Sequence, residues 1–226
     1  MMTPEELAGK IDLSLLKPTS TKGEVEALVR GAQKFPFATV CVPPCHAGFA
    51  ARLSIKDGGS GTKISTVVGF PLGYTTTSIK TNEAKKAIEE GAEEIDMVMN
   101  ISMLKSGEFS YVEDDISAVV TAVPHALVKV IIEACYLTDE EKSRAVDMLI
   151  GSGADFVKTS TGFGPGGAAA GDVRLIKERA AGRIKIKAAG GIKSLEEALK
   201  MIEAGADRIG TSAGVEIVEG FLRGVD

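Results

Sequence analysis

Gly153-Ala154-Asp155-Phe156-Val157-Lys158 is a joint between a helix and a strand, and the chain repeats this joint elsewhere. Gly91-Ala92-Glu93 precedes the apolar run Ile95–Val98, and Gly205-Ala206-Asp207 precedes Arg208–Gly210. An amphipathic stretch comes before each glycine, which is well placed to end a helix in a left-handed backbone conformation. The repeat indicates a chain built from successive helix-to-strand units.

Helix starts are marked just as regularly. A hydroxyl residue followed three positions later by a glutamate forms a capping box, in which each side chain bonds to the other's backbone N–H. This spacing occurs at Thr3/Glu6, Thr21/Glu24, Thr138/Glu141 and Ser194/Glu197. Pro4 falls at a first helical position, where its missing N–H is not needed. The pattern predicts a short helix at the start and further helices along the chain.

Short apolar runs between these marks predict strands. The candidates are residues 10–15, 38–43, 63–69, 94–100, 127–133, 156–160, 184–190 and 208–212. Several, such as Leu127–Glu133, are too apolar for a sheet with one wet face, which favours a parallel sheet under helices. Eight strands alternating with helices favour a closed barrel over an open doubly wound sheet. With no linker or composition shift, residues 1–226 are predicted to form one (β/α)₈ TIM barrel with a short N-terminal helix.

The composition limits the classes of partner. Acidic residues number 31 against 26 basic ones, and no basic run would attract nucleic acid. No apolar stretch reaches the length of about 18 residues that a membrane span needs, and no signal peptide is predicted. The three cysteines, Cys41, Cys45 and Cys135, are too few for a disulfide framework, which favours a cytoplasmic location.

Charged residues gather on one face of the predicted strands. Period-two parity assigns mostly Ile, Val, Met and Leu to the other face, which the helices should cover, so the charges should point into the barrel. The inward set is Asp12, Glu94, Asp96, Lys129, Glu133, Lys158, Lys185, Lys187 and Arg208. Buried charges need partners, so the set predicts a network, a function or both. Glu94, Lys129, Lys185 and Arg208 lie early in their strands or have opposite-sign neighbours, which favours structural roles for them.

Lys158 and Lys187 lie on consecutive strands, near the carboxyl ends where barrel active sites form. A lysine near other cations in a partly desolvated pocket loses its proton more easily than a free lysine. The neutral amine attacks a carbonyl to give a Schiff base, whose iminium accepts electrons when an adjacent bond breaks. A carboxylate such as Asp96 can then move protons together with the second lysine.

Two loops rich in small residues follow the last two predicted strands. They read Ala189-Gly190-Gly191 and Gly210-Thr211-Ser212-Ala213-Gly214, and the second opens a helix. Small residues let backbone N–H groups approach an anion, and the helix dipole adds to the attraction. Phosphate sites in such barrels often follow strands seven and eight, so a phosphate group is predicted here.

Two other patterns suggest a cofactor or a metal but lack their partners. Gly162–Gly167 fits the dinucleotide pattern G-x-G-x-x-G, yet the next strand does not end in the expected acid, so a turn or lid is the better interpretation. Cys41, Cys45 and His46 have no second cysteine pair, and the other histidine, His125, lies far along the chain. The sequence predicts no cofactor and no metal.

Several segments resemble the deoxyribose-phosphate aldolases, a family of class I aldolases. Phe156–Gly162, containing K-T-S-T-G, resembles the family's Schiff-base segment, and Ile186–Ile192, containing K-A-A-G-G, resembles its second-lysine segment. Further matches, in the family's order, are Ile11–Leu13, Val40–Pro43, Glu94–Asn100 and Lys129–Glu133. The resemblance spans almost the whole chain.

The resemblance implies a reaction and roles for the site residues. The reaction is the reversible cleavage of 2-deoxy-D-ribose 5-phosphate to acetaldehyde and D-glyceraldehyde 3-phosphate, without metal or organic cofactor. Lys158 would form the imine, Lys187 would perturb it and share proton transfer, and Asp96 would be the acid/base partner. Asp12 would orient the hydroxylated end of the substrate. The remaining predicted substrate contacts are Cys41, Thr161, Gly162, Gly190, Gly191, Gly210 and Ser212.

Phe163 departs from the family's pattern. Some relatives carry a lysine at this place, so one cationic phosphate contact is predicted to be absent. Two alternatives stay open: another Schiff-base aldolase acting on a different sugar phosphate, and a phosphosugar-binding barrel without catalysis. Because barrels of this kind commonly pair through their outer helices, a homodimer or homotetramer is expected.

Overall fold

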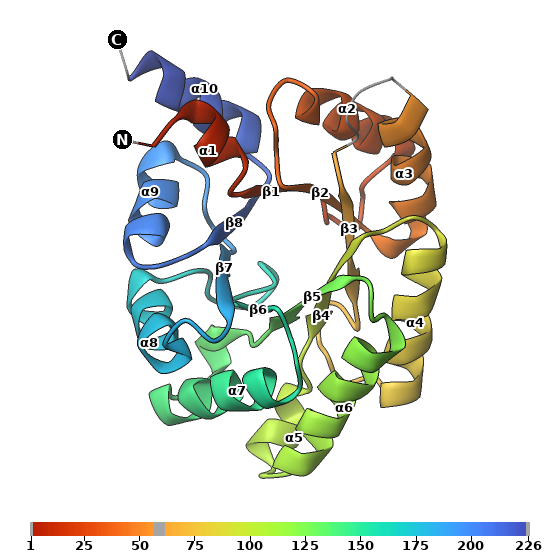
Figure 1. The fold of residues 1–226 in the computed structure, drawn as a ribbon, viewed down its shortest axis with the longest axis vertical. Helices are drawn as coiled ribbons and strands as arrows, with labels where there is room; N and C mark the ends of the chain where they lie inside the picture. The colour runs from red at the N-terminus through yellow and green to blue at the C-terminus, as the bar shows by residue number, and fades with distance from the viewer. Residues whose placement is uncertain (1, 57–61, 225–226) are drawn as a thin grey trace.

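The strands form a closed ring in the computed structural model, which describes residues 2–56 and 62–224. They are β1 (Ile11–Ser14), β2 (Thr39–Val42), β3 (Ile64–Val68), β4 (Glu94–Val98), β5 (Leu127–Ile131), β6 (Phe156–Lys158), β7 (Lys185–Ala189) and β8 (Arg208–Thr211). Each strand pairs in parallel with the next, and β8 closes the ring on β1. Figure 1 shows the ring from one end, with helices around it. Each predicted strand contains one of these strands, and the predicted (β/α)₈ barrel is confirmed.

Helices cover the outside of the ring. They are α1 (Pro4–Ala8), α2 (Lys22–Ala32), α3 (Ala47–Lys56), α4 (Thr77–Glu89), α5 (Ile101–Lys105), α6 (Phe109–Ala122), α7 (Asp139–Gly151), α8 (Ala170–Ala180), α9 (Leu195–Glu203) and α10 (Gly214–Arg223), with 3₁₀ turns η1 (Pro44–His46) and η2 (Ala134–Tyr136). The short helix α1 packs against α10, so the first and last helices lie side by side (Figure 1). No helix in the described ranges is long and apolar enough to cross a membrane.

The helix starts and the helix-to-strand joints occur where the sequence predicts them. The capping boxes at the starts of α1, α2, α7 and α9 are all present, with both reciprocal bonds. The glycines of the three helix-to-strand joints have positive φ: +101° at Gly91, +77° at Gly153 and +115° at Gly205. These values lie in the region that side chains disfavour, which explains why glycine occupies each joint.

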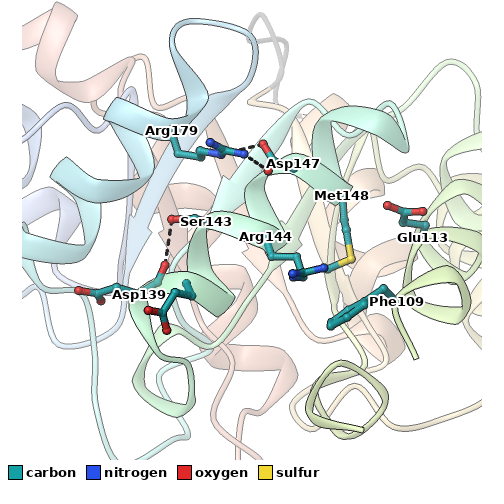
Figure 2. A pocket seen from close by; sticks show the side chains of 9 residues that line it. Phe109, Glu113, Asp139, Ser143, Arg144, Asp147, Met148 and Arg179 are labelled. Carbon is teal, nitrogen blue, oxygen red and sulfur yellow. Dashed lines mark hydrogen bonds and ion pairs between the residues drawn. The ribbon is translucent and has the colours of Figure 1, made fainter. Parts of the chain in front are cut away.

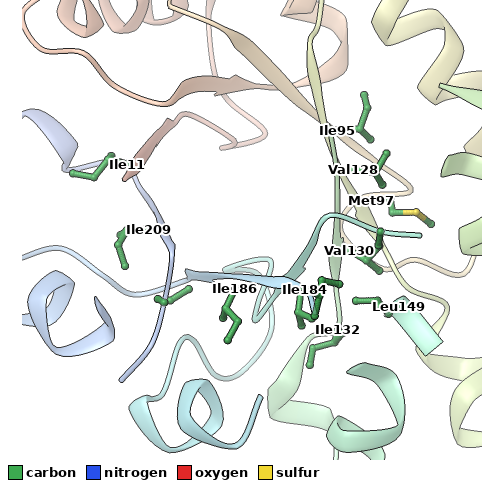
Figure 3. Close-up of a cluster of buried hydrophobic side chains, with 14 of the residues drawn as sticks. Ile11, Ile95, Met97, Val128, Val130, Ile132, Leu149, Ile184, Ile186 and Ile209 are labelled. Atoms are coloured by element: carbon green, nitrogen blue, oxygen red, sulfur yellow. The ribbon is translucent and has the colours of Figure 1, made fainter. Parts of the chain in front are cut away.

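The apolar core lies between the strands and the helices. Figure 3 shows Ile95, Met97, Val128 and Val130 on the outer face of β4 and β5, pointing toward the helical layer. All of them are buried, as are their counterparts on the other strands. Since side chains alternate along a strand, the residues between them face the inside of the ring.

The register between strands then decides which inward residues meet. Lys158 on β6 pairs with Lys187 on β7, and Asp96 on β4 pairs with Lys129 on β5. Lys158 and Asp96 lie on strands separated only by β5. The closed ring therefore brings residues from distant parts of the chain into one small interior.

Candidate active site

Asp96 is the centre of the charged interior. Its Oδ2 accepts hydrogen bonds from Lys158 Nζ at 2.8 Å and Lys187 Nζ at 2.7 Å, and its Oδ1 accepts one from Lys129 Nζ at 2.8 Å. All four side chains are buried. One carboxylate thus holds three amines from three adjacent strands, and the predicted meeting of Lys158 and Lys187 inside the barrel is confirmed.

Two further carboxylates and an arginine complete the cluster. Asp12 Oδ2 lies 2.5 Å from Lys187 Nζ, and Glu94 Oε2 lies 2.6 Å from both Lys129 Nζ and an Arg208 guanidinium nitrogen. We call the set the charge network; its members are Asp12, Glu94, Asp96, Lys129, Lys158, Lys187 and Arg208. With every group ionised, four cations face three carboxylates. The network balances when one lysine is neutral.

Lys158 is the lysine best suited to lose its proton. Burial lowers the pKa of Lys158; the carboxylate of Asp96 opposes this effect, and the nearby ammonium of Lys187 adds to it, so that the pKa lies below its ordinary value. A lowered pKa leaves more of the side chain as a neutral amine, which is the nucleophilic form.

The other two lysines of the charge network remain cationic. Burial pushes the pKa of Lys187 downward, but the carboxylates of Asp12 and Asp96 outweigh it and raise the pKa above its ordinary value. The pKa of Lys129 is raised in the same way, with Asp96 the largest opposing influence on burial. Burial would raise the pKa of Asp96, yet the surrounding lysines hold it well below its usual range. Asp96 is therefore a carboxylate throughout the neutral range.

A cavity of about 380 Å³ opens above Lys158 at the carboxyl end of the barrel. Its lining comes from the segments that follow β1, β6, β7 and β8: Ser14–Pro18, Thr161–Phe163, Ala189–Lys193 and Gly210–Ser212. Within the charge network, Lys158 is the member that lines this cavity; its side chain keeps a small exposed fraction while Lys129 and Lys187 have none. A carbonyl compound entering the cavity would meet Lys158 first.

Most of the predicted substrate contacts meet in this cavity. Thr161, Gly162, Gly190, Gly191, Gly210 and Ser212 all line it. Gly162 and Gly190 have φ of +84° and +93°. A Cβ at Gly210 would lie 3.0 Å from Lys187 Cε and 2.9 Å from Ala189 Cβ. Glycine at 210 therefore leaves room for the second lysine.

Two predicted contact residues lie outside the cavity lining. Asp12 is fully buried and engaged with Lys187, Lys129 and Arg208. Cys41 is also fully buried, in β2, where burial and then the Asp96 carboxylate raise the pKa of its thiol. The thiol is thus held in its neutral form beside the charge network.

Lys185 is a correction to the predicted inward set. It is on the same strand face as Lys187 but lies two residues earlier, at the amino end of β7, where its side chain is exposed. Its Nζ lies 5.7 Å from the centre of the Phe156 ring, over which the Arg208 guanidinium also lies, at 5.0 Å. Parity identifies the face of a side chain but not its height in the barrel.

The sequence patterns also missed residues at the cavity. Lys17 follows β1 and Lys193 follows β7, and both line the cavity. Their positions in the sequence could have identified them, because each lysine comes within four residues of the carboxyl end of a strand. These two lysines bring to the cavity a positive charge that the phenyl ring of Phe163 does not supply.

A second hollow lies on the outer helices (Figure 2). Its volume is about 630 Å³, and it lies between α6, α7 and the end of α8. Arg179 is paired with Asp147, and the Arg144 guanidinium lies 4.3 Å from the centre of the Phe109 ring. No member of the charge network lines this hollow, so it does not share the lysine chemistry of the barrel end.

Comparisons with known proteins agree in both sequence and structure. Residues 11–220 match the sequence model of the DeoC/LacD family aldolases. A deoxyribose-phosphate aldolase from Carboxydothermus hydrogenoformans is 50% identical over 230 residues, with all of both chains covered. One from Streptococcus equi subsp. zooepidemicus is 53% identical over 210 residues, covering 93% of this chain and 94% of the relative.

Solved structures give the same match. An aldolase called QR15 superposes with a TM-score of 0.92 at 44% identity and covers 96% of each chain. A tetrameric deoxyribose phosphate aldolase from Aeropyrum pernix has a TM-score of 0.90 at 37% identity, covering 97% of this chain and 92% of its own. The similarity extends over nearly the whole barrel.

Proposed function

The chain belongs to the DeoC/LacD family of class I aldolases, and we propose that it cleaves 2-deoxy-D-ribose 5-phosphate reversibly to acetaldehyde and D-glyceraldehyde 3-phosphate. Lys158 is the proposed Schiff-base nucleophile. One observation carries this assignment: within the charge network, the lysine with a lowered pKa is the one that lines the cavity. The other two lysines are fully buried and have raised pKa values.

The proposed reaction begins at the amine of Lys158. The neutral Nζ attacks C1 of the open-chain sugar, and loss of water leaves an iminium. Removal of the proton from the C3 hydroxyl breaks the C2–C3 bond; its electrons flow into the iminium, and glyceraldehyde 3-phosphate leaves. The resulting enamine takes a proton at C2, and hydrolysis releases acetaldehyde and the free amine. Lys158 is unchanged after one cycle.

Proton transfer is proposed for the pair of Asp96 and Lys187. Asp96 is bonded to Lys158 itself, so a proton can move between them directly or through one water molecule. Lys187 remains an ammonium and can return a proton to the same region. The contact of Asp12 with Lys187 supports an added role for Asp12 in holding that ammonium, beside its predicted contact with the substrate.

The phosphate group is proposed to lie between the loops after β6, β7 and β8. Gly162, Gly190, Gly191, Gly210 and Ser212 surround this end of the cavity, and Thr161 completes the proposed substrate-binding set. The helix α10 starts just after Ser212, so its N-terminal dipole favours a negative charge there.

A trapping experiment tests the proposal. The protein is incubated with acetaldehyde and borohydride, and peptide mass spectrometry locates the reduced ethyl adduct. The adduct is expected on Lys158 and is expected to disappear in Lys158→Ala. An unmodified wild-type Lys158 would contradict the proposal. A barrel that only binds phosphosugars would give no adduct, and an aldolase for a different sugar phosphate would give poor trapping with acetaldehyde.

We also propose an assembly, a location and a domain organisation. The tetramer named for the Aeropyrum pernix structure supports a homodimer or homotetramer here, which light scattering after size-exclusion chromatography would measure. The three free cysteines of the described ranges support a cytoplasmic location. Residues 1–226 are proposed to act as one catalytic domain, of which residues 1, 57–61 and 225–226 lie outside the described ranges.

A further inference from the structure

Glu133 has an unusual backbone and an unusual environment. It follows β5 with φ of +45° and ψ of +65°, a left-handed conformation that a residue with a long side chain seldom adopts. Its side chain is buried, and within residues 2–56 and 62–224 no lysine or arginine forms an ion pair with it. A strained backbone and a buried carboxylate without a counter-ion are both unfavourable unless the surroundings require them.

The carboxylate of Glu133 is bonded to Thr161 instead. The backbone N–H of Thr161 donates to Oε1 at 3.2 Å and Oε2 at 3.3 Å, and Thr161 Oγ1 donates to Oε2. The backbone N–H of Phe163 in turn donates to Thr161 Oγ1 at 3.0 Å. A Cβ at Gly164 would lie 3.2 Å from Glu133 Cδ. The loop that leaves β6 is therefore wrapped around this carboxylate.

The same loop continues to the glycines proposed to bind phosphate. The N–H of Ala168 donates to Gly190 O at 2.9 Å, and a Cβ at Gly167 would collide with Gly190 O. Gly162 also packs against Gly190, whose added Cβ would lie 3.5 Å from Gly162 Cα. A continuous run of contacts thus leads from Glu133 to the phosphate end of the cavity.

We propose that Glu133 is a positioning residue that holds the loop after β6 against Gly190 and so fixes the phosphate end of the site. The inference rests on the proposed function. Glu133 is not among the residues that line the cavity, so its effect passes through Thr161. The strained backbone at Glu133 persists because these contacts hold its side chain under the loop.

Glu133→Ala removes the acceptor of both Thr161 donors and is the primary test. The KM for 2-deoxy-D-ribose 5-phosphate is expected to rise about tenfold to a hundredfold, the loss that a misplacement of about 1 Å causes. The kcat/KM for 2-deoxy-D-ribose, which has no phosphate, is expected to stay within about twofold, because that substrate does not use the loop. Glu133→Gln keeps an acceptor oxygen for the Thr161 N–H and is expected to restore part of the loss.

Matched variants separate positioning from general destabilisation. Glu6→Ala breaks another glutamate–threonine pair, with Thr3, in the helix that leads into the amino end of β1, and should leave KM unchanged. Thr161→Val combined with Glu133→Ala should raise KM by less than the product of the two separate effects, since both substitutions remove the hydroxyl–carboxylate bond. If Glu133→Ala does not fold, Glu133→Gln and Thr161→Val carry the test through their separate KM values.

Three results have distinct meanings. A selective rise of KM for the phosphorylated substrate, with acetaldehyde still trapped on Lys158, supports the positioning role. Equal losses for both substrates, or an unchanged KM in Glu133→Ala and Thr161→Val alike, overturn it while the aldolase assignment stands. Failure of trapping in the wild-type protein instead removes the proposed function on which the positioning role rests.

Discussion

Lys187→Leu is the substitution that tests the charge network most directly. It removes an ammonium that lies 2.5 Å from Asp12 Oδ2 and 2.7 Å from Asp96 Oδ2, and leaves both carboxylates buried with one cation fewer. Breaking a buried ion pair from one side costs about 3–5 kcal/mol. A folded domain has about 5–15 kcal/mol of stability, so we expect a variant that still folds but unfolds at a lower urea concentration.

The same substitution changes the protonation of Lys158. Asp96 then has two lysine contacts rather than three and holds the proton of Lys158 more strongly, while the repulsion from Lys187 is lost. The pKa of Lys158 therefore rises toward the ordinary value of about 10.4, at which only about one amine in a thousand is neutral at a pH of about 7.4. Since a higher pKa lowers the neutral fraction at a given pH, Schiff-base formation near neutral pH should slow.

The assay is the rate at which acetaldehyde is trapped on Lys158, measured as a function of pH. The trapping rate of Lys187→Leu is expected to rise at a higher pH than the trapping rate of the wild type. Lys185→Leu is the control, because this exposed lysine is on the same strand face and outside the charge network. A Lys187→Leu curve that rises at the wild-type pH would refute the electrostatic reasoning.

Further predictions concern the network and the phosphate loops. Lys158→Met removes the lysine whose neutral form balances the network and leaves three cations facing three carboxylates, so we expect no trapped adduct and an equal or higher urea midpoint; a marked drop in the midpoint would contradict the charge balance. Because the pKa of Asp96 is lowered in the fold, its ionised form stabilises the protein above about pH 4, and this stabilisation is lost as pH falls through the folded pKa. Because the pKa of Lys187 is raised, its ammonium stabilises the protein below about pH 10, and this stabilisation is lost as pH rises through the folded pKa. Urea midpoints should therefore form a plateau between these limits, and an unchanged midpoint in acid would be the opposite result. Gly190→Ala strains a backbone at φ +93° and brings a Cβ to 3.2 Å from the facing loop, so we expect a loss of about 1–3 kcal/mol and a higher KM for the phosphorylated sugar. Gly182→Ala has a similar φ of +79° with open space around it and should leave KM unchanged; equal KM values in the two variants would count against the phosphate assignment.

The fold was predictable because its signals are local. Each strand such as Leu127–Ile131 is a short apolar run, and each preceding joint such as Gly91-Ala92-Glu93 ends a helix with a glycine at positive φ. These features depend on a few neighbouring residues, so the sequence contains them directly. The eight strands and the capping boxes formed where these signals occur.

The sequence predicted which residues belong to the site better than it predicted which of them contact each other. Alternation along the strands identifies Asp96, Lys158 and Lys187 as inward residues, but the contact of Asp96 with three lysines depends on how the closed ring aligns its strands. The exposure of Lys185 follows from the same alignment. Register in a barrel is a property of the whole ring, and no short segment encodes it.

Contacts within the helical layer were also beyond the sequence patterns. Lys80 on α4 is fully buried and donates to Asp115 on α6 at 2.6 Å and to Val98 O at 2.9 Å. A lysine on an amphipathic helix ordinarily faces water, so its burial depends on how α4 and α6 pack together. The left-handed backbone at Glu133 was equally beyond the sequence patterns, because it depends on the loop that Thr161 anchors.

Closure of the ring has a consequence for folding. Arg208 and Asp12 are 196 residues apart in the chain, and Asp96 and Lys187 are 91 apart, yet both pairs share the interior. An intermediate lacking the last strands would leave Asp12 and Glu94 without Arg208, so water must keep solvating them until late in assembly. Dehydration of the interior should therefore accompany the docking of β8 on β1, which makes a half-formed barrel both inactive and wet inside.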